Sequence, residues 1–303
     1  LDSCIVTGNT AVYWGGGVMC RQRAAVNNCL IAGNQGGSGG GIYYYRGGAA
    51  NHCTITGNTA TNRAGGIYSD SCEAGSVTRN CIVWQNTLNG TADEWYVYSA
   101  AAPFESCCVT LTNGIPGGVG CATNDPRFLD APNADFRIGY GSPCIDTGAN
   151  PAGVTNDLAG TPRPLGAGCD RGAYEYDGDA IDTDRDGLVD NDELLQYGTS
   201  PTHTNTDGDF ASDYEEMIAA TDGADSNDYF HIIAIQRTNS AAVLFACTNS
   251  RVYSLQAVTN MVGGEWLLVD GAVNRQGDAS GTMTLTDTND LFFKAYRVGV
   301  RLP

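Results

Sequence analysis

Residues 51–60 read NHCTITGNTA, and this stretch returns in altered form at three other places in the chain. The related segments are SCIVTGNTA from residue 3, NCLIAGNQ from residue 28 and NCIVWQNT from residue 80. In each copy a Val or Ile follows the cysteine by two positions, and an asparagine follows it by five. A second pattern, Gly-Gly before Val or Ile, recurs at residues 16–18, 40–42 and 65–67. The chain therefore begins with a repeat of about 25 residues.

Each repeat holds short strand patterns separated by Gly and Asn turn residues. Units of this size bury their apolar positions only by stacking on their neighbours. Because side chains alternate along a strand, the cysteine and the following Val or Ile point to the same side, which we expect to be the interior. Equivalent asparagines in adjacent coils would lie ~4.8 Å apart and form a hydrogen-bonded ladder. The repeat predicts a mainly β fold, a right-handed parallel β-helix, with Cys107 or Cys108 marking a fifth coil.

Three later stretches resemble the segment that closes many parallel β-helices of large secreted bacterial proteins. They are NDPRFLD (124–130), ADFRIGYGSPCIDTGAN (134–150) and DLAGTPRPLGAGCDRGAYEY (157–176). The resemblance implies that residues 1–176 form one β-helix domain with a closing segment. It does not select an activity, because this fold hosts lyases, hydrolases, adhesins and structural proteins alike.

The net charge of -18 is concentrated in one segment, since residues 177–228 hold 16 of the 34 acids and a single base, Arg185. Such a cluster repels itself unless cations bind to it. Nucleic acid is an unsuitable partner, because phosphate binding requires a basic face. No apolar run reaches the ~18 residues of a membrane span. Twelve cysteines indicate an oxidising, extracellular or cell-surface location.

The first acidic loop, residues 182–193, reads DTDRDGLVDNDE. It places oxygen-bearing side chains at positions 1, 3, 5, 9 and 12, a glycine at position 6 and a backbone carbonyl at position 7, which is the spacing of an EF-hand-like calcium loop. The candidate ligands are Asp182, Asp184, Asp186, Leu188, Asp190 and Glu193.

A second loop, residues 205–216, repeats this spacing with Phe210 in place of the glycine. Its candidate ligands are Asn205, Asp207, Asp209, Ala211, Asp213 and Glu216. Short helical patterns follow both loops, so residues 177–228 predict a small calcium-binding loop-helix segment, with a solvated acidic linker as the alternative. The pair resembles thrombospondin type 3 repeats, which implies a calcium-stiffened spacer, and is related to dockerin modules, which would imply cohesin binding.

Residues 229–303 alternate between apolar and polar residues in six or seven short stretches, which predicts an antiparallel β-sandwich. This part resembles the terminal modules of secreted bacterial multi-domain proteins. Attachment, sorting and assembly are all compatible with it.

Catalytic signals are sparse. Asn205-Thr206-Asp207-Gly208 matches a motif of polygalacturonase-like β-helix enzymes, but it falls inside the second acidic loop. Arg46, Arg63 and Arg79 lie on the coils, where a polysaccharide lyase-like enzyme would need a base, but solvated surface charge is the simpler interpretation. Carbohydrate binding is the other alternative: Tyr43, Tyr68 and Trp14 form either a sugar platform or a plain aromatic ladder.

The cysteines allow two interpretations. Inward cysteines of adjacent coils lie within disulfide range, so Cys4 with Cys29 and Cys53 with Cys81 are candidate pairs. Alternatively these are small buried side chains, and the disulfides join Cys20 to Cys72 or Cys144 to Cys169.

These features favour a non-catalytic extracellular structural or adhesive protein that requires Ca²⁺. Because the chain starts at Leu1 inside a repeat, we expect a processed or truncated product with an open strand edge. Self-association through that edge into a head-to-tail filament, or contact with a cell surface or polysaccharide, is the expected mode of partnership.

Overall fold

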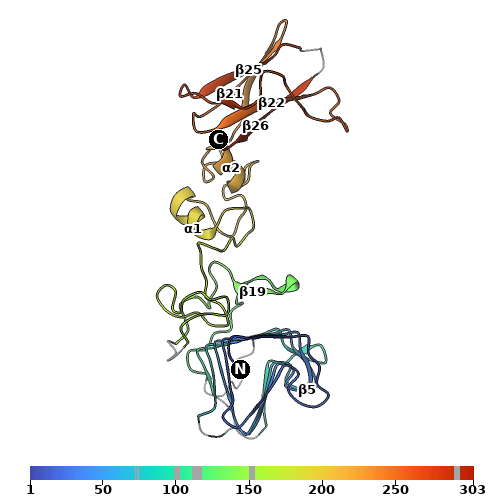
Figure 1. The fold of residues 1–303 in the computed structure, drawn as a ribbon, viewed down its shortest axis with the longest axis vertical. Coiled ribbons are helices and arrows are strands. Elements are labelled where there is room, and N and C mark those ends of the chain that lie inside the picture. Colours follow the sequence, from blue (N-terminus) through green and yellow to red (C-terminus); the bar gives the residue numbers. More distant parts are fainter. Residues whose placement is uncertain (72, 74, 99–102, 111–117, 150–153, 290–293) are drawn as a thin grey trace. The chain divides into compact units, whose positions relative to one another are not determined.

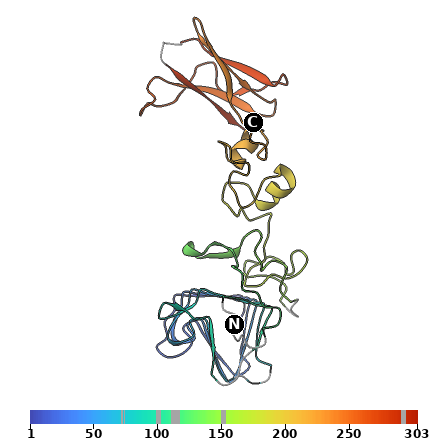
Figure 2. The same ribbon diagram turned by 180° about the vertical axis from the view of Figure 1, so that it is seen from behind.

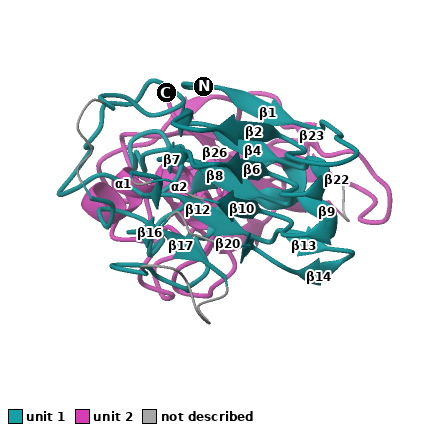
Figure 3. Cartoon of the chain, turned by 90° about the horizontal axis from the view of Figure 1, so that it is seen from below, with its two compact units in different colours: residues 1–181 teal, residues 182–303 magenta. Residues whose placement is uncertain are grey.

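The computed structural model describes residues 1–303 except 72, 74, 99–102, 111–117, 150–153 and 290–293. It divides into two compact units, Leu1–Ile181 and Asp182–Pro303, which are coloured separately in Figure 3. The predicted parallel β-helix is confirmed in the first unit, where successive coils lie on one another (Figure 1). The predicted boundary at residue 228 lies inside the second unit.

Four sheets run along the described part of the β-helix, and their parallel strands come from successive coils. The first has the order β1 (Ile5–Thr7), β4 (Leu30–Ala32), β8 (Thr54–Thr56), β12 (Ile82–Trp84) and β17 (Cys108–Val109). The second contains β2 (Val18–Arg21), β6 (Ile42–Tyr45), β10 (Ile67–Ser71) and β15 (Trp95–Val97). The third contains β3 (Ala25–Asn27), β7 (Ala49–Asn51), β11 (Val77–Arg79) and β16 (Phe104–Glu105). The fourth contains β5 (Gln35–Ser38), β9 (Thr59–Arg63), β13 (Thr87–Leu88) and β14 (Thr91–Ala92), and only β13 and β14 pair antiparallel.

The repeated cysteines form a single column inside the β-helix, as predicted. The backbone N–H of Cys4 donates to Cys29 Sγ at 3.3 Å, and that of Cys53 donates to Cys81 Sγ at 3.4 Å. The column continues through Cys107, whose N–H donates to Cys121 Sγ at 3.4 Å. All the described cysteines are free thiols. The pairings suggested for this column therefore remain predictions, as does Cys144 with Cys169, while Cys72 lies outside the described residues.

The asparagines form the predicted ladder, and it has a direction. Asn34 Nδ2 donates to Asn58 Oδ1 at 3.0 Å, and Asn58 Nδ2 donates to Asn86 Oδ1 at 2.9 Å. At the last rung, Asn86 Nδ2 donates to the carboxylate of Glu94 at 2.6 Å. Glu94 is fully buried and also accepts from the hydroxyl of Thr110. Because a carboxylate only accepts, Glu94 ends the ladder where a further asparagine would extend it.

The closing segment covers the outer side of the first sheet. Its hairpin, β18 (Phe128–Asp130) and β19 (Asp135–Ile138) around the 3₁₀ turn η1 (Ala131–Asn133), is the green ribbon in Figures 1 and 2. Ile138 and Cys144 are buried with Ile82, Trp84 and Cys108, which point outward from the sheet. This sheet is therefore buried on both faces.

Buried charges hold the closing segment in place. Arg163 pairs with Glu175, and both side chains are fully buried. Asp170 accepts from the backbone N–H groups of Asp146 and Tyr176. Arg171 donates to the carbonyl oxygens of Cys107 and Gly120 at 3.0 and 2.8 Å, so it caps the last coil. Removing one partner of such a network leaves an uncompensated buried charge. The charged residues of segment 157–176 therefore stabilise the packing of the closing segment.

The second unit begins with the acidic loops. These carry the short helix α1 (Asp190–Asp192), which runs into the π-helical turn η2 (Glu193–Tyr197), and the helix α2 (Asp213–Ala219). A capping box between Ser212 and Glu215 starts α2. Arg251 donates to the carbonyl oxygens of Met217 and Ile218 near its end. Arg251 thereby ties the second acidic loop to the sheets that follow.

Those sheets are antiparallel. One contains β20 (Ile232–Arg237), β21 (Ala241–Ala246) and β25 (Thr282–Asp287). The other contains β22 (Val252–Val258), β23 (Leu267–Leu268), β24 (Arg275–Gln276) and β26 (Ala295–Arg301). Phe245 of the first sheet and Tyr253 and Leu255 of the second are fully buried in a common core. No helix in the described residues is both long and apolar enough to cross a membrane.

Asn58 lies in the middle of the ladder, and its replacement tests how much the ladder contributes. Asn58→Ala removes the hydrogen bonds that Asn58 Nδ2 donates to the carbonyl of Ile31 and to Asn86 Oδ1, and it leaves the backbone N–H of Asn34 without its acceptor. We expect it to lower the free energy of unfolding by about 3 kcal/mol in urea denaturation. Asn62→Ala is the control, because Asn62 is exposed and donates to Ser38 at the surface. Equal losses in both variants would contradict a stabilising ladder.

Glu94 predicts a pH dependence. Burial raises the pKa of its carboxyl from 4.5 to about 7, although Asn86 and Thr110 donate to the charged form. Since the folded chain retains this proton to higher pH than the unfolded chain, the stabilisation is complete below pH 4.5 and is lost as pH rises through about 7. Relative to Glu94→Gln, the wild-type free energy of unfolding should fall by about 3 kcal/mol between pH 4.5 and 8. A difference that stays constant across this range would rule out Glu94 as the titrating group.

Candidate metal centre

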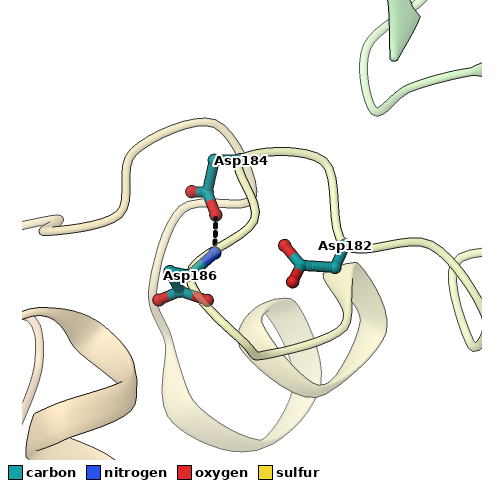
Figure 4. Close-up of side chains that lie close together, drawn as sticks. All are labelled: Asp182, Asp184 and Asp186. Carbon is teal, nitrogen blue, oxygen red and sulfur yellow. Dashed lines mark hydrogen bonds between the residues drawn. The ribbon is translucent and has the colours of Figure 1, made fainter. Parts of the chain in front are cut away.

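The two acidic loops bring their carboxylates together as the sequence pattern predicts. In the first loop, oxygen atoms of Asp182, Asp184 and Asp186 lie within 4.8 Å of one another. Figure 4 shows these three side chains close together in the loop. In the second loop, the carboxylates of Asp207, Asp209 and Glu216 meet within the same distance. Both groups are partly or fully withdrawn from solvent. The loops therefore concentrate negative charge.

Backbone N–H groups orient these carboxylates in the same way in both loops. Asp184 Oδ1 accepts from the N–H of Asp186 at 3.2 Å (Figure 4), and Asp186 Oδ1 accepts from that of Leu188 at 2.8 Å. Asp207 Oδ1 and Asp209 Oδ1 accept from the N–H groups two residues further on, at 3.1 and 2.7 Å. Each of these hydrogen bonds uses Oδ1 of the carboxylate, and Oδ2 takes no part in it.

The remaining oxygens form an unpartnered set. Six buried carboxylate oxygens have no hydrogen-bond partner, three in each loop, at positions 3, 5 and 12. They are Oδ2 of Asp184, Asp186, Asp207 and Asp209, and Oε2 of Glu193 and Glu216. Burying an acceptor without a partner is costly, and a buried charge without one costs more. A cation bound in each loop would satisfy all six.

Burial and mutual repulsion raise the pKa of several loop carboxyls. The pKa of Asp184 rises to about 6, through burial and then the charge of Asp186. That of Glu193 rises to about 8, through burial and then Asp184 and Asp186. That of Glu216 rises to about 7, through burial and then Asp207 and Asp209. All three shifts reflect a cluster whose ionised form lacks a counter-charge.

Position 9 is used differently from the sequence expectation. Asp190 Oδ1 and Oδ2 accept from the N–H and hydroxyl of Thr183 at 2.8 and 2.7 Å. Asp213 accepts from both groups of Thr206 in the same way, at 2.8 Å each. These two aspartates are fully buried and fasten the loop to the following helix. The threonine at position 2 of each loop is therefore a hydrogen-bond partner of the aspartate at position 9, and the ligand spacing did not predict this contact.

The residues at positions 1 and 7 of the loops make different hydrogen bonds. Asp182 accepts from the N–H groups of Arg185 and Gly187, and Asn205 Oδ1 accepts from that of Gly208. Leu188 and Ala211 contribute N–H groups to the carboxylates at position 5. Their carbonyl groups are the candidate ligands at position 7.

Phe210 at the glycine position is accommodated by the backbone. Gly187, at position 6 of the first loop, has φ +110°, and Arg185 at position 4 has φ +67°. In the second loop Gly208 at position 4 has φ +78°, whereas Phe210 is not among the residues with positive φ. A left-handed residue at position 4 is therefore common to both loops, and the missing glycine does not prevent the turn.

The two loops influence each other. A Cβ on Gly187 would come within 3.1 Å of the Tyr214 ring, so this glycine allows the second loop to pack against the first. The charge of Asp213 contributes to raising the pKa of Asp184 and of Glu193. A cation in one loop would therefore change the electrostatic energy of the other.

The predicted aromatic residues lie on the outer face of the second sheet. Tyr43 and Tyr68 stack with ring centroids 5.0 Å apart, and Tyr68 stacks on Tyr96 at 5.6 Å. Tyr43 and Tyr68 are only 5% and 8% exposed, because each covers the other's ring. Trp14 lies beside Tyr43 and is 55% exposed. The geometry is that of the aromatic ladder, with Trp14 as its accessible end.

The other candidates for chemistry occupy structural settings. Arg46 lies over the ring of Tyr45, Arg63 over that of Tyr96, and Arg79 pairs with Glu105. His52 is fully buried between the carbonyl of Asp170 and the side chain of Asn80. Burial lowers its pKa to about 3, so it is neutral.

Two sets of buried polar residues escaped the sequence analysis. Glu94 departs from the Cys-to-Asn pattern, and its only signal is an acid directly before the inward Trp95 of β15, which is too common to be informative. The buried pair of Arg163 and Glu175 lies in the closing segment, where the charged residues within an otherwise small-residue stretch were a usable signal. Both sets belong to the scaffold.

The comparisons with known proteins concern one repeat. Residues 52–70 match a family model described as Chlamydia polymorphic membrane protein (Chlamydia_PMP) repeat. The matched segment runs from the third copy of the Cys-to-Asn pattern through the third Gly-Gly-Ile unit and into β10. No curated protein and no solved structure matches the chain. The match and the stacked parallel sheets agree in indicating a parallel β-helix protein.

Proposed function

We propose that this chain is a non-catalytic structural or adhesive protein of a bacterial surface, and that its acidic loops bind two Ca²⁺ ions. The observation that carries the calcium assignment is the set of six buried, unpartnered carboxylate oxygens at equivalent positions of the two loops. A solvated acidic linker would direct these oxygens to water. Their burial in two equal sets instead supports a pair of cation sites.

The donor set favours Ca²⁺ over other common metals. All candidate donors are oxygens, and no His or Cys lies within residues 182–193 or 205–216. Hard cations prefer oxygen, while zinc sites in proteins use nitrogen and sulfur. Mg²⁺ demands a nearly octahedral shell and retains several waters, whereas Ca²⁺ accepts six to eight oxygens in flexible geometry. Calcium also fits the expected extracellular location, where it is abundant.

Bound calcium would make the acidic segment rigid. Neutralising the carboxylates removes the repulsion that raises their pKa values, and it joins positions 3, 5 and 12 of each loop through one ion. In the second loop, Glu216 precedes the two carbonyl groups that Arg251 holds. Calcium is therefore placed to stiffen the segment up to the antiparallel sheets of residues 229–303, which we propose form a β-sandwich.

The surface role rests on the coil repeat. The family model that matches residues 52–70 is named for polymorphic membrane proteins, and the β-helix is compatible with a non-catalytic surface protein. Arg46 and Arg63 lie over tyrosine rings and Arg79 pairs with an acid, which favours scaffold over a lyase-like base.

Isothermal titration of the full chain, freed of metal with EDTA, tests the calcium assignment. We expect two Ca²⁺ per chain and a rise in the midpoint of thermal unfolding with calcium concentration. Asp186→Asn and Asp209→Asn each remove one unpartnered oxygen and its charge, so each should weaken one site at least tenfold, about 1.4 kcal/mol, and leave the other measurable.

Asp192→Asn is the matched control. Asp192 is an exposed acid beside Glu193, and its replacement removes the same charge without touching the unpartnered oxygens. Its titration should resemble that of the wild type. Absence of binding, or an equal loss in Asp192→Asn and Asp186→Asn, would contradict two built sites and favour diffuse screening.

Head-to-tail self-association belongs to the same proposal. The first coil exposes apolar side chains, among them Ile5, Val12 and Tyr13, which are 62%, 77% and 71% exposed. A second copy adding its strands to β1 would cover them. Light scattering and electron microscopy should show particles that lengthen with protein concentration when calcium is present. A monomer at all concentrations would refute assembly without affecting the calcium sites.

A further inference from the structure

A cleft of about 330 Å³ opens on the outer face of the second sheet of the first unit. Its lining consists of Trp14, Met19, Arg21, Tyr43, Tyr45 and Asp70. The volume falls within the roughly 300–1,000 Å³ of small-molecule sites. The strand pairing explains how these residues meet, because Met19 lies opposite Tyr43 and Arg21 lies opposite Tyr45 in adjacent coils.

The floor of the cleft is rigid. Tyr43 is fixed between Trp14 and Tyr68, with ring centroids at 6.0 and 5.0 Å. Burial, followed by the charge of Asp70, raises the pKa of the Tyr43 hydroxyl to about 12, so it keeps its proton. The chain beside Trp14 is pinned to the next coil, since the N–H of Ser38 donates to the carbonyl of Tyr13 and that of Gly15 donates to the carbonyl of Ser38. A ligand would thus meet a preformed surface.

The walls combine an apolar plane with an opposite pair of charges. Trp14 is 55% exposed and Met19 is 47% exposed, so both offer apolar surface to the cleft. Arg21 lies over the ring of Tyr45, with its guanidinium carbon 5.4 Å from the ring centroid. A guanidinium only donates hydrogen bonds and an ionised carboxylate only accepts them. Arg21 and Asp70 therefore suit a ligand whose polar groups do both.

We propose that this cleft binds a neutral pyranose unit of a glycan. Sugar hydroxyls both donate and accept, and the C–H face of the ring is apolar enough to lie on the indole of Trp14. The two charged side chains that line the cleft have opposite sign, so they add no net charge that would favour an anion. A uronate carboxylate would meet Asp70 as well as Arg21, so the cleft offers acidic sugars no net attraction. This site lies in the first unit and is independent of the calcium loops.

The test uses the full chain and an array of defined oligosaccharides. Neutral glucans, mannans and galactans are printed beside uronate oligomers, and the neutral hit is then titrated by calorimetry. Trp14→Ala should weaken binding at least tenfold, and Arg21→Gln should weaken it severalfold. Tyr13→Ala is the matched control: Tyr13 is a neighbouring aromatic residue, 71% exposed, that does not line the cleft, and its replacement should leave affinity unchanged.

Each other outcome overturns the assignment. Failure of all neutral glycans to bind would refute it, as would binding confined to uronates. Equal losses in Trp14→Ala and Tyr13→Ala would show adhesion to the exposed first coil. Loss of glycan binding upon dilution of an associated form would show that the site lies between two copies. Thermal unfolding of each variant shows whether it is folded. If Trp14→Ala fails to fold, Arg21→Gln, at an exposed position, tests the site in its place. Binding should persist in EDTA, so this result is separate from that of the calcium titration.

Discussion

In-register stacking of one coil on the next is the constraint on which the first unit depends. Parallel strands leave every coil to satisfy its backbone through its neighbours, so a shift by one residue would turn cysteines and isoleucines outward. The asparagine ladder opposes such a shift, because each side chain bonds to its equivalent in the next coil and to a backbone carbonyl. Glu94 ends the ladder as a hydrogen-bond acceptor. Arg171 donates hydrogen bonds to the last backbone carbonyls.

The same requirement explains the closing segment. The first sheet carries apolar and small side chains on its outer face as well as its inner one, and these must be covered. Gly172, with φ +94°, passes so close to the sheet that a Cβ would lie 2.7 Å from Ile82 Cδ1. Its neighbours Arg171 and Ala173 bond to the coils through Cys107 and Thr54. A larger residue at position 172 would separate the segment from the sheet that it covers.

The acidic loops obey the opposite logic. Stacked coils bury groups that satisfy one another, whereas the loops bury groups that repel one another. Backbone N–H bonds and the threonine clamps of Asp190 and Asp213 hold the carboxylates in this arrangement. This arrangement keeps like charges together and leaves six buried oxygens without a hydrogen-bond partner, which is the observation on which the proposed cation sites rest. The outer face of the second sheet is different again, because its side chains are not needed for stacking between strands and are available for recognition.

Much of the architecture was readable from the sequence, because it repeats. The spacing from cysteine to asparagine predicted which side chains face inward, and the loop spacing predicted which carboxylates of residues 182–193 and 205–216 come together. Local periodicity determines both, since each depends on residues within one coil or one loop. The sequence could not show that Asp190 and Asp213 would bond to threonines, because ligand spacing is the same whether an oxygen faces a metal or a hydroxyl.

The tertiary structure decided which residues from distant parts of the sequence are in contact. Only the folded chain shows that Glu94 ends the ladder, that Arg163 and Glu175 are buried together, and that Arg21 and Asp70 share a cleft with Trp14. Tyr43 and Tyr68 were correctly expected on neighbouring coils, but stacking covers their faces and leaves Trp14 as the accessible ring. The sequence by itself determined the repeat, its inward face and the acidic loops, since these follow from local spacing. Which groups are satisfied and which remain exposed depended on contacts between coils, and those contacts exist only after stacking.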